Sequence, residues 1–316
     1  MKVARSGTPP RATAPPSPPA ARSRGTAARS PVQGLHGGCG RYGDPGYRKQ
    51  QDAQQHLTNS GTINWGAGTW IGTGNVQNAT GGVFNINFDS FGQLQVPVVN
   101  TGAVNHTVSG NFATSTTFTN SSGGSVNVNA GTWTFATAWS NAGTLNIPTG
   151  RTLFVTSAGS LNAGSAFTGA GTFSVSSTVT QNTPWTNTTS ILLLEVGAIW
   201  NTTTGNGTTI APGGTLTWNS GTIAGPAGFT VAAGATATLA TANNKTLNST
   251  LTNSGTINWG AGTWIGDRQR RTPPEGCSTS TSTAWANCSS VVNSGAVNHT
   301  QYGNFTTSHL HQQQRR

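Results

Sequence analysis

The sequence predicts an all-β protein, a β-solenoid with coils of roughly 20 residues and irregular or disordered termini. Three observations lead to this prediction. A turn motif returns about every 20 residues, apolar residues alternate with small polar ones, and the composition disfavours helices. Glycine accounts for 43 of 316 residues and charged residues for only 7%. With abundant Ser, Thr and Asn, this mixture has low helix propensity and suits short strands joined by turns.

The turn motif is Asn-(Ser/Thr/Ala)-Gly-(Thr/Ala)-(Ile/Leu/Val)-Asn. It occurs as NSGTIN (59–64), NTGAVN (100–105) and NAGTLN (141–146), with a looser NSSGGSVN at 120–127. The leading asparagines are therefore 41, 20 and 21 residues apart, so the first step spans two coils. Asn and Gly tolerate the left-handed backbone of tight corners. We expect the asparagines at equivalent corners to stack into a hydrogen-bonded ladder.

The segments between the turns are predicted to be short strands. Apolar residues recur at every second position, as in Val126 and Val128 or Trp133 and Phe135, which indicates half-buried strands rather than helix. A coil of this size buries its apolar side only by stacking on neighbours, with equivalent strands paired in parallel. A β-sandwich or a set of immunoglobulin-like domains is the competing all-β interpretation. The near-constant spacing of the corner motif favours the solenoid.

The two ends of the chain resemble the middle translated in a shifted reading frame. LTNSGTINWGAGTWIG occurs at 57–72 and again, 194 residues later, at 251–266. VVNTGAVNHT (98–107) and VVNSGAVNHT (291–300) are 193 residues apart, so one residue is lost between the two copies. A coding sequence for TPPEGCSTSTST (272–283), read one base earlier, can encode NATGGVFNINFD, which is 78–89. The same shift relates 8–29 to 201–222.

This hypothesis divides the chain into five segments. Residues 57–266 form the solenoid repeat region and 291–308 the in-frame start of a repeated unit. Residues 1–56 are out of frame or disordered, and 267–290 and 309–316 are out of frame. The alternative is that the ends are genuine Pro/Arg-rich disordered tails.

The charge and the cysteines of the chain do not indicate a nucleic-acid partner or a metal site. The net charge is +10, but Asp89, Arg151, Glu195 and Lys245 are the only charged residues in 57–266 and sum to zero. The basic excess belongs to the ends, so we expect no nucleic-acid partner. The spacing of Cys277 and Cys288 in the tail fits no zinc site. We therefore expect no metal and no cofactor.

The N-terminus contains no apolar core of a signal peptide. The longest aliphatic run, ILLLEV (191–196), is too short to span a bilayer.

The corner motifs NSGTIN, NTGAVN and NAGTLN, with the phrases GAGTW, GAGTF and GGTLTW, carry a family resemblance. They resemble the repeats of filamentous-haemagglutinin-like adhesins and autotransporter passenger domains of bacteria. The resemblance implies a right-handed parallel β-helix and an extracellular or cell-surface location for the parent protein. It also implies that the solenoid face binds host or matrix glycans or surface proteins. The secretion-recognition domain and membrane-anchoring barrel usual in such proteins are not visible, which suggests a fragment.

Catalysis is not expected. Glycoside hydrolysis usually needs two neighbouring carboxylates, whereas Asp89 and Glu195 lie roughly five coils apart on a solenoid of this period. We expect His106 at the surface or at a corner. The sequence therefore predicts no enzyme and no catalytic residue, but a structural or adhesive repeat region. The alternative is a carbohydrate-binding or polysaccharide-degrading β-helix.

The tryptophans of the repeat region have two interpretations. We expect them to pack in the core or on the coil surface, and the alternative is that some are sugar-stacking platforms. They are Trp65, Trp70, Trp133, Trp139, Trp185, Trp200 and Trp218.

Overall fold

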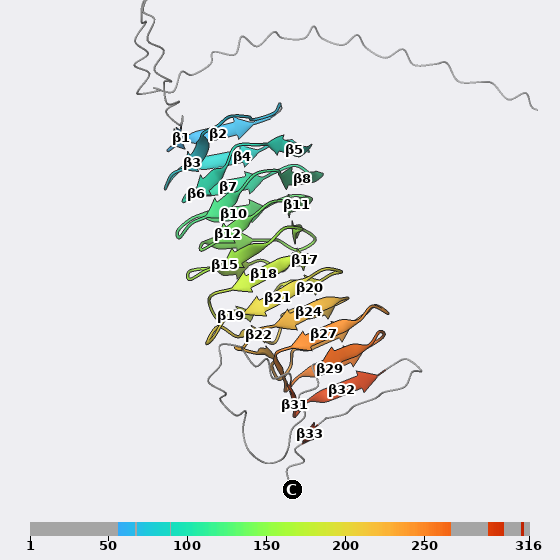
Figure 1. The fold of residues 1–316 in the computed structure, drawn as a ribbon. Helices are drawn as coiled ribbons and strands as arrows, with labels where there is room; N and C mark the ends of the chain where they lie inside the picture. The colour runs from blue at the N-terminus through green and yellow to red at the C-terminus, as the bar shows by residue number, and fades with distance from the viewer. Residues whose placement is uncertain (1–55, 67, 89, 267–289, 300–310, 313–316) are drawn as a thin grey trace, which may run out of the picture. The chain divides into compact units, whose positions relative to one another are not determined.

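The computed structural model describes residues 56–66, 68–88, 90–266, 290–299 and 311–312. These residues belong to one compact unit, Asp52–Arg316, and every regular element among them is a strand (Figure 1). The predicted segments 1–56, 267–290 and 309–316 lie outside the described residues, apart from 56, 290, 311 and 312. Of the in-frame segment 291–308, the structure describes 291–299.

The predicted β-solenoid is confirmed. Successive strands along the chain go to three different faces, and each strand then pairs in parallel with its equivalent in the next coil. Paired residues such as Asn78, Asn100 and Asn120 are 19 to 24 residues apart through almost the whole stack. The strand pairs among the described residues are parallel, which excludes the sandwich alternative. The right-handed sense of the coil stays a prediction.

Four sheets make up the three faces. Sheet 1 covers the first face: β1 (His56–Asn59), β3 (Asn75–Asn78), β6 (Val98–Asn100), β9 (Phe118–Asn120), β12 (Trp139–Asn141), β15 (Gly159–Leu161), β18 (Thr178–Gln181), β21 (Ile199–Thr202), β24 (Gly221–Ala224), β27 (Lys245–Asn248) and β30 (Trp264–Gly266). Sheet 3 covers another: β5 (Ser90–Leu94), β8 (Asn111–Thr114), β11 (Thr132–Phe135), β14 (Thr152–Val155), β17 (Thr172–Val175), β20 (Ile191–Leu194), β23 (Thr215–Trp218), β26 (Thr236–Leu239), β29 (Thr256–Trp259) and β32 (Ala296–His299).

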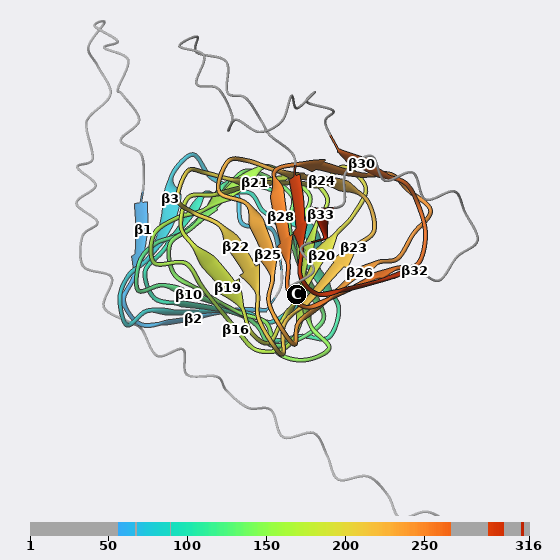
Figure 2. The ribbon, with the colours of Figure 1, turned by 90° about the horizontal axis from the view of Figure 1, so that it is seen from below.

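The remaining face is divided between two sheets. Sheet 2 holds β2 (Thr62–Trp65), β4 (Val83–Ile86), β7 (Ala103–His106), β10 (Ser125–Val128), β13 (Thr144–Asn146) and β16 (Ala166–Thr168). Sheet 4 holds β19 (Trp185–Asn187), β22 (Thr208–Ile210), β25 (Phe229–Val231), β28 (Thr250–Asn253), β31 (Ser290–Asn293) and β33 (His311–Gln312). Between β16 and β19 the strand pairing stops. Figure 2 shows that β19, β22 and β25 of sheet 4 lie at a different place and run in a different direction from β2 and β10 of sheet 2.

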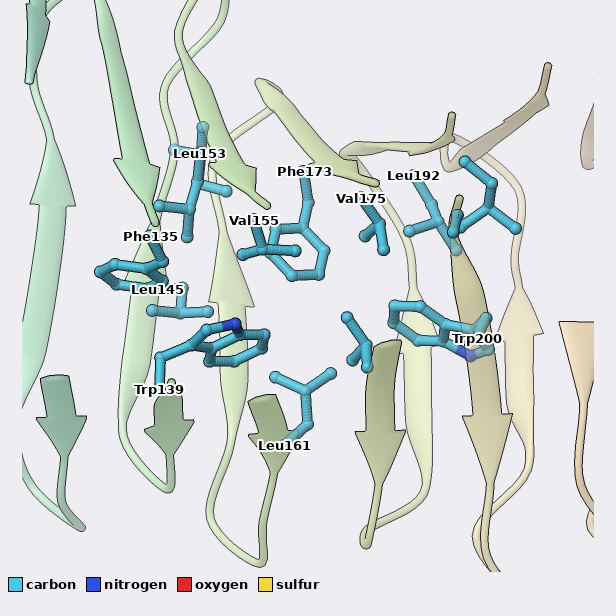
Figure 3. Packing of buried hydrophobic residues seen from close by; sticks show 14 of the residues in the cluster. Phe135, Trp139, Leu145, Leu153, Val155, Leu161, Phe173, Val175, Leu192 and Trp200 are labelled. Carbon is cyan, nitrogen blue, oxygen red and sulfur yellow. The ribbon is translucent and has the colours of Figure 1, made fainter. Parts of the chain in front are cut away.

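The interior of the coils is a continuous apolar core (Figure 3). Trp133, Phe173 and Trp200 are fully buried, and the rings of Phe135 and Trp139 stack with centroids 5.7 Å apart. Apolar burial stabilises a fold by about 25 cal/mol per Å². Because each coil buries its apolar side only against its neighbours, this stabilisation belongs to the stack rather than to any single coil.

The predicted asparagine ladder is also confirmed. At the corner between sheets 1 and 2, the side-chain amide Nδ2 of each asparagine donates to Oδ1 of the next, over 2.7 Å at every step. The same amides donate to backbone carbonyls of the turn, for example Asn78 Nδ2 to Ala103 O at 3.0 Å. Buried polar groups satisfied in this way fix the corner without an energetic penalty. The ladder comprises Asn59, Asn78, Asn100, Asn120 and Asn141.

The sixteen-residue repeat occupies different faces in its two copies. LTN lies in β1 of sheet 1 in the first copy and in β28 of sheet 4 in the second. TINW lies in β2 of sheet 2 and then in β29 of sheet 3. β27 is the ninth strand after β1 in sheet 1, and β28 follows it on the next face. The duplicated unit is therefore nine coils plus one face long.

Candidate functional site

In the described part of the chain, no three His, Cys, Asp or Glu residues come together in a group that could hold a metal ion. Asp89 lies outside the described residues. Glu195 follows β20 and accepts a hydrogen bond from Asn219 Nδ2 at 3.1 Å. β5, which starts directly after position 89, is five strands away from β20 in sheet 3. Among the residues that the structure describes, no helix has the length and apolarity that a membrane crossing requires.

The expected surface or corner position of His106 is wrong. His106 is the last residue of β7 and its side chain is completely buried. Its Nδ1 lies 2.9 Å from the carbonyl oxygen of Ala130, and its ring centroid is 5.8 Å from that of Phe112. The period-two pattern that directs Val104 inward also directs His106 inward. The alternating pattern therefore indicated a buried side chain at position 106, but the expectation followed the polarity of histidine instead.

The tryptophans behave as core residues, as expected. Six of the seven are buried, and Trp70, the seventh, is half-buried and packs edge-on against Trp65 with centroids 5.8 Å apart. A sugar ring stacks only on an exposed aromatic face, so these buried rings are not stacking platforms. The six are Trp65, Trp133, Trp139, Trp185, Trp200 and Trp218.

Lys245 is a buried cation that the sequence analysis did not single out. It opens β27 with no exposed surface. Its Nζ donates to the carbonyl oxygens of Thr241 at 2.5 Å, Asn243 at 2.8 Å and Ala261 at 3.2 Å. Burial lowers the pKa of Lys245 from its ordinary value of 10.5. The ammonium group joins the loop before β27 to the turn before β30.

The outward face of sheet 3 carries a regular polar surface on three neighbouring strands. Its strands β23, β26 and β29 read TLTW, TATL and TINW, with the leucine, alanine or isoleucine buried and the flanking residues outward. Two columns of side chains result, because Thr215 pairs with Thr236, and Thr217 with Thr238. The pairing continues from β26 to β29. We call these six outward positions the threonine array: Thr215, Thr217, Thr236, Thr238, Thr256 and Asn258.

The outward face of sheet 2 carries a different ladder. Asn105 Nδ2 donates to Asn85 Oδ1, and Asn127 Nδ2 to Asn105 Oδ1, each at 2.7 Å. These amides satisfy one another along the stack. Within the described residues, by contrast, no side-chain hydrogen bond joins the five threonine hydroxyls of the array to other protein groups. The hydroxyls are thus available to an external partner.

We compared the chain with known proteins. No model of a known protein family, no curated protein and no solved structure matches it.

Proposed function

We propose that this chain is a non-catalytic structural or adhesive repeat region of a bacterial surface or secreted protein. The main support is the stack of parallel coils, in which one apolar core continues from coil to coil and the asparagine ladder joins the coils from Asn59 to Asn141. Such a stack supplies length and a repeated outer surface. Host or matrix glycans and surface proteins are the partners proposed for that surface.

The charge distribution supports a binding role rather than catalysis. The ammonium group of Lys245 donates hydrogen bonds to three backbone carbonyl oxygens. Glu195 is the only acid among the described residues of 57–266. Hydrolysis by two carboxylates needs a second acid close to Glu195. The alternative, a polysaccharide-degrading β-helix, therefore requires a different catalytic arrangement.

We also propose that this translation contains frameshifted segments. β31 pairs directly with β28, and β32 with β29, at a spacing of 40 residues instead of 19 to 24. In the first copy, the equivalents of β28 and β31 are β1 and β6, and β3 lies between them. The stack thus passes over one coil where the frameshift hypothesis places 267–290. Resequencing of the locus tests this: DNA that encodes 267–290 as written, with peptides from 1–56 found in cells, contradicts the hypothesis.

The function is tested on the purified full chain. Binding to immobilised glycans and extracellular-matrix proteins is measured beside the release of reducing or unsaturated sugar ends from a panel of polysaccharides. Binding without product release supports the proposal. Product release that Glu195→Gln abolishes overturns it in favour of a polysaccharide-degrading enzyme.

A further inference from the structure

We propose that the threonine array binds the surface of an ice crystal. The inference deepens the proposed adhesive role, on which it rests, by naming crystalline water as a surface that the solenoid holds. Its basis is the two-column array of β23, β26 and β29, in which five threonine hydroxyls and the Asn258 amide repeat in two directions. A periodic array of hydrogen-bond donors and acceptors fits a partner whose own hydrogen-bonding groups are arranged periodically.

The spacing of the array follows from strand geometry. Neighbouring strands lie about 4.8 Å apart, and alternate residues of one strand about 6.7 Å apart. The first distance is close to an oxygen–oxygen repeat on the prism face of hexagonal ice, and the second is somewhat shorter than the repeat in the perpendicular direction. A threonine hydroxyl donates one hydrogen bond and accepts others, and its methyl group orders the water around it. The array can therefore hold water in positions that continue into the crystal.

The array is rigid enough to preserve this spacing. Threonine is β-branched, so its χ1 angle is restricted in a strand. Below the array, Leu216, Trp218 and Ile257 are buried and fix the sheet from inside. Binding to such a surface costs little side-chain conformational entropy, because the side chains are already ordered.

Charge and aromatic content favour ice over a glycan as the occupant of the array. The outward positions of β23, β26 and β29 carry no charged side chain, so they match an uncharged lattice and offer no ion pair to an acidic sugar. Trp218 of β23 is buried, and the array itself contains no aromatic ring on which a neutral sugar can stack. A glycan would thus have hydroxyl contacts alone.

The array also has defined limits. Its columns continue onto β20 as Ile191 and Leu193. Further along sheet 3, Thr132, Thr152 and Thr172 are again in register with one another, but the neighbouring column there contains Phe154. The bulk of that ring interrupts the two-dimensional lattice. We therefore assign the ice contact to β23, β26 and β29.

The test uses the purified full chain in an ice-recrystallisation assay and in a nanolitre osmometer that records the shape of single ice crystals. The wild-type chain is expected to slow recrystallisation and to facet the crystals. Thr217→Lys and Thr238→Lys, which place a charged chain in the array, are expected to abolish both effects. Thr119→Lys is the matched control: Thr119 is a half-buried outward strand residue of sheet 1, in β9, and this variant keeps full activity.

Thr238→Val provides a variant that is expected to keep the fold, since valine has nearly the shape and the strand preference of threonine. It removes one hydroxyl and is expected to weaken faceting. Inactivity of a wild-type chain with the circular dichroism of a β-protein overturns the ice assignment, as does equal loss of activity in Thr119→Lys. Either result leaves the adhesive proposal intact, because glycan and matrix binding are measured separately. Product release from polysaccharides overturns the adhesive proposal without affecting the ice assay.

Discussion

Individual buried polar residues determine how the corners of this solenoid are built. Asn78, Asn100 and Asn120 exchange side-chain hydrogen bonds inside the core, and Lys245 closes a loop with its ammonium group. A buried donor or acceptor that loses its partner costs about 1–3 kcal/mol, more than the hydrogen bond itself contributes. Substitutions at these positions are therefore more informative than substitutions of the surrounding Thr and Ser.

Asn120→Ala is expected to lower the free energy of unfolding by about 2–4 kcal/mol, because it leaves both Asn100 Nδ2 and Asn141 Oδ1 without their ladder partner. The matched control is Asn105→Ala, which interrupts the outward ladder of sheet 2. Water can replace the lost amide there, so a change below about 1 kcal/mol is expected. Urea unfolding of both variants measures the difference. Equal losses would show that burial of the ladder has no energetic role.

Lys245 is expected to make the free energy of unfolding change with pH in the alkaline range. Burial holds the pKa of Lys245 in the folded protein below 10.5, so the unfolded chain binds the proton more tightly. The free energy of unfolding therefore rises as pH increases from the lowered folded-state pKa towards 10.5. Lys245→Met removes the titrating group and should remove this part of the rise. Parallel pH profiles for the two proteins between pH 7 and 11 would contradict the burial of this lysine.

At the scale of single strands, one large and one small residue fit together between two neighbouring coils. Gly159 opens β15 and pairs with Trp139 of β12. A Cβ at position 159 would collide with the indole ring of Trp139, so the glycine provides space for the ring. Sheet 2 ends one strand later, where Phe167 of β16 meets Trp185 of β19 at 4.7 Å between ring centroids.

Gly159→Ala is expected to destabilise the fold by about 1–3 kcal/mol, because the added methyl forces the Trp139 ring out of its packed position. Gly61→Ala is the control, since a Cβ at position 61 meets nothing within 4 Å and the backbone there does not require glycine. Thermal unfolding and the tryptophan fluorescence maximum are measured for both. A red shift in Gly159→Ala alone is expected, and unchanged fluorescence would contradict the collision.

The elements show how far the sequence predicts this fold. The alternation in β10, β11 and β14 and the spacing of the corner asparagines are local patterns, so they predicted strands, corners and parallel stacking correctly. The division between sheets 2 and 4 depends on Gln181, which takes the corner position after Leu161 and donates to the carbonyls of Thr183, Asn206 and Gly207. These contacts span coils. No local sequence pattern predicts these contacts. The burial of His106 and Lys245 was also not predicted, because polar residues are expected at the surface even where the alternation of the strand directs them inward.

At the scale of the whole described region, equivalent strands of successive coils pair in parallel from β1 to β33. The corner between β27 and β28 is the single residue Ser249, whereas residues 267–289 separate β30 from β31 at the equivalent corner of the next coil. Asn253 nevertheless donates to Asn293 Oδ1 at 2.7 Å, the same distance as in the regular ladder. The contacts that join one coil to the next therefore depend on the corner and strand residues and not on the length of the chain between them.

Deletion of 267–288, which leaves Ser289 as a one-residue corner, is expected to preserve the stack. Shortening a loop lowers its closure entropy by about 0.6 kcal/mol per halving of length, so stability should rise slightly. Deletion of 122–142 is the control, because it removes one coil together with the buried Trp133, Phe135 and Trp139. Its urea m-value should fall with the apolar area lost, while that of the first deletion should not. Equal falls in m-value would mean that 267–288 packs as a coil, and the interpretation of this segment as a passed-over coil would then be wrong.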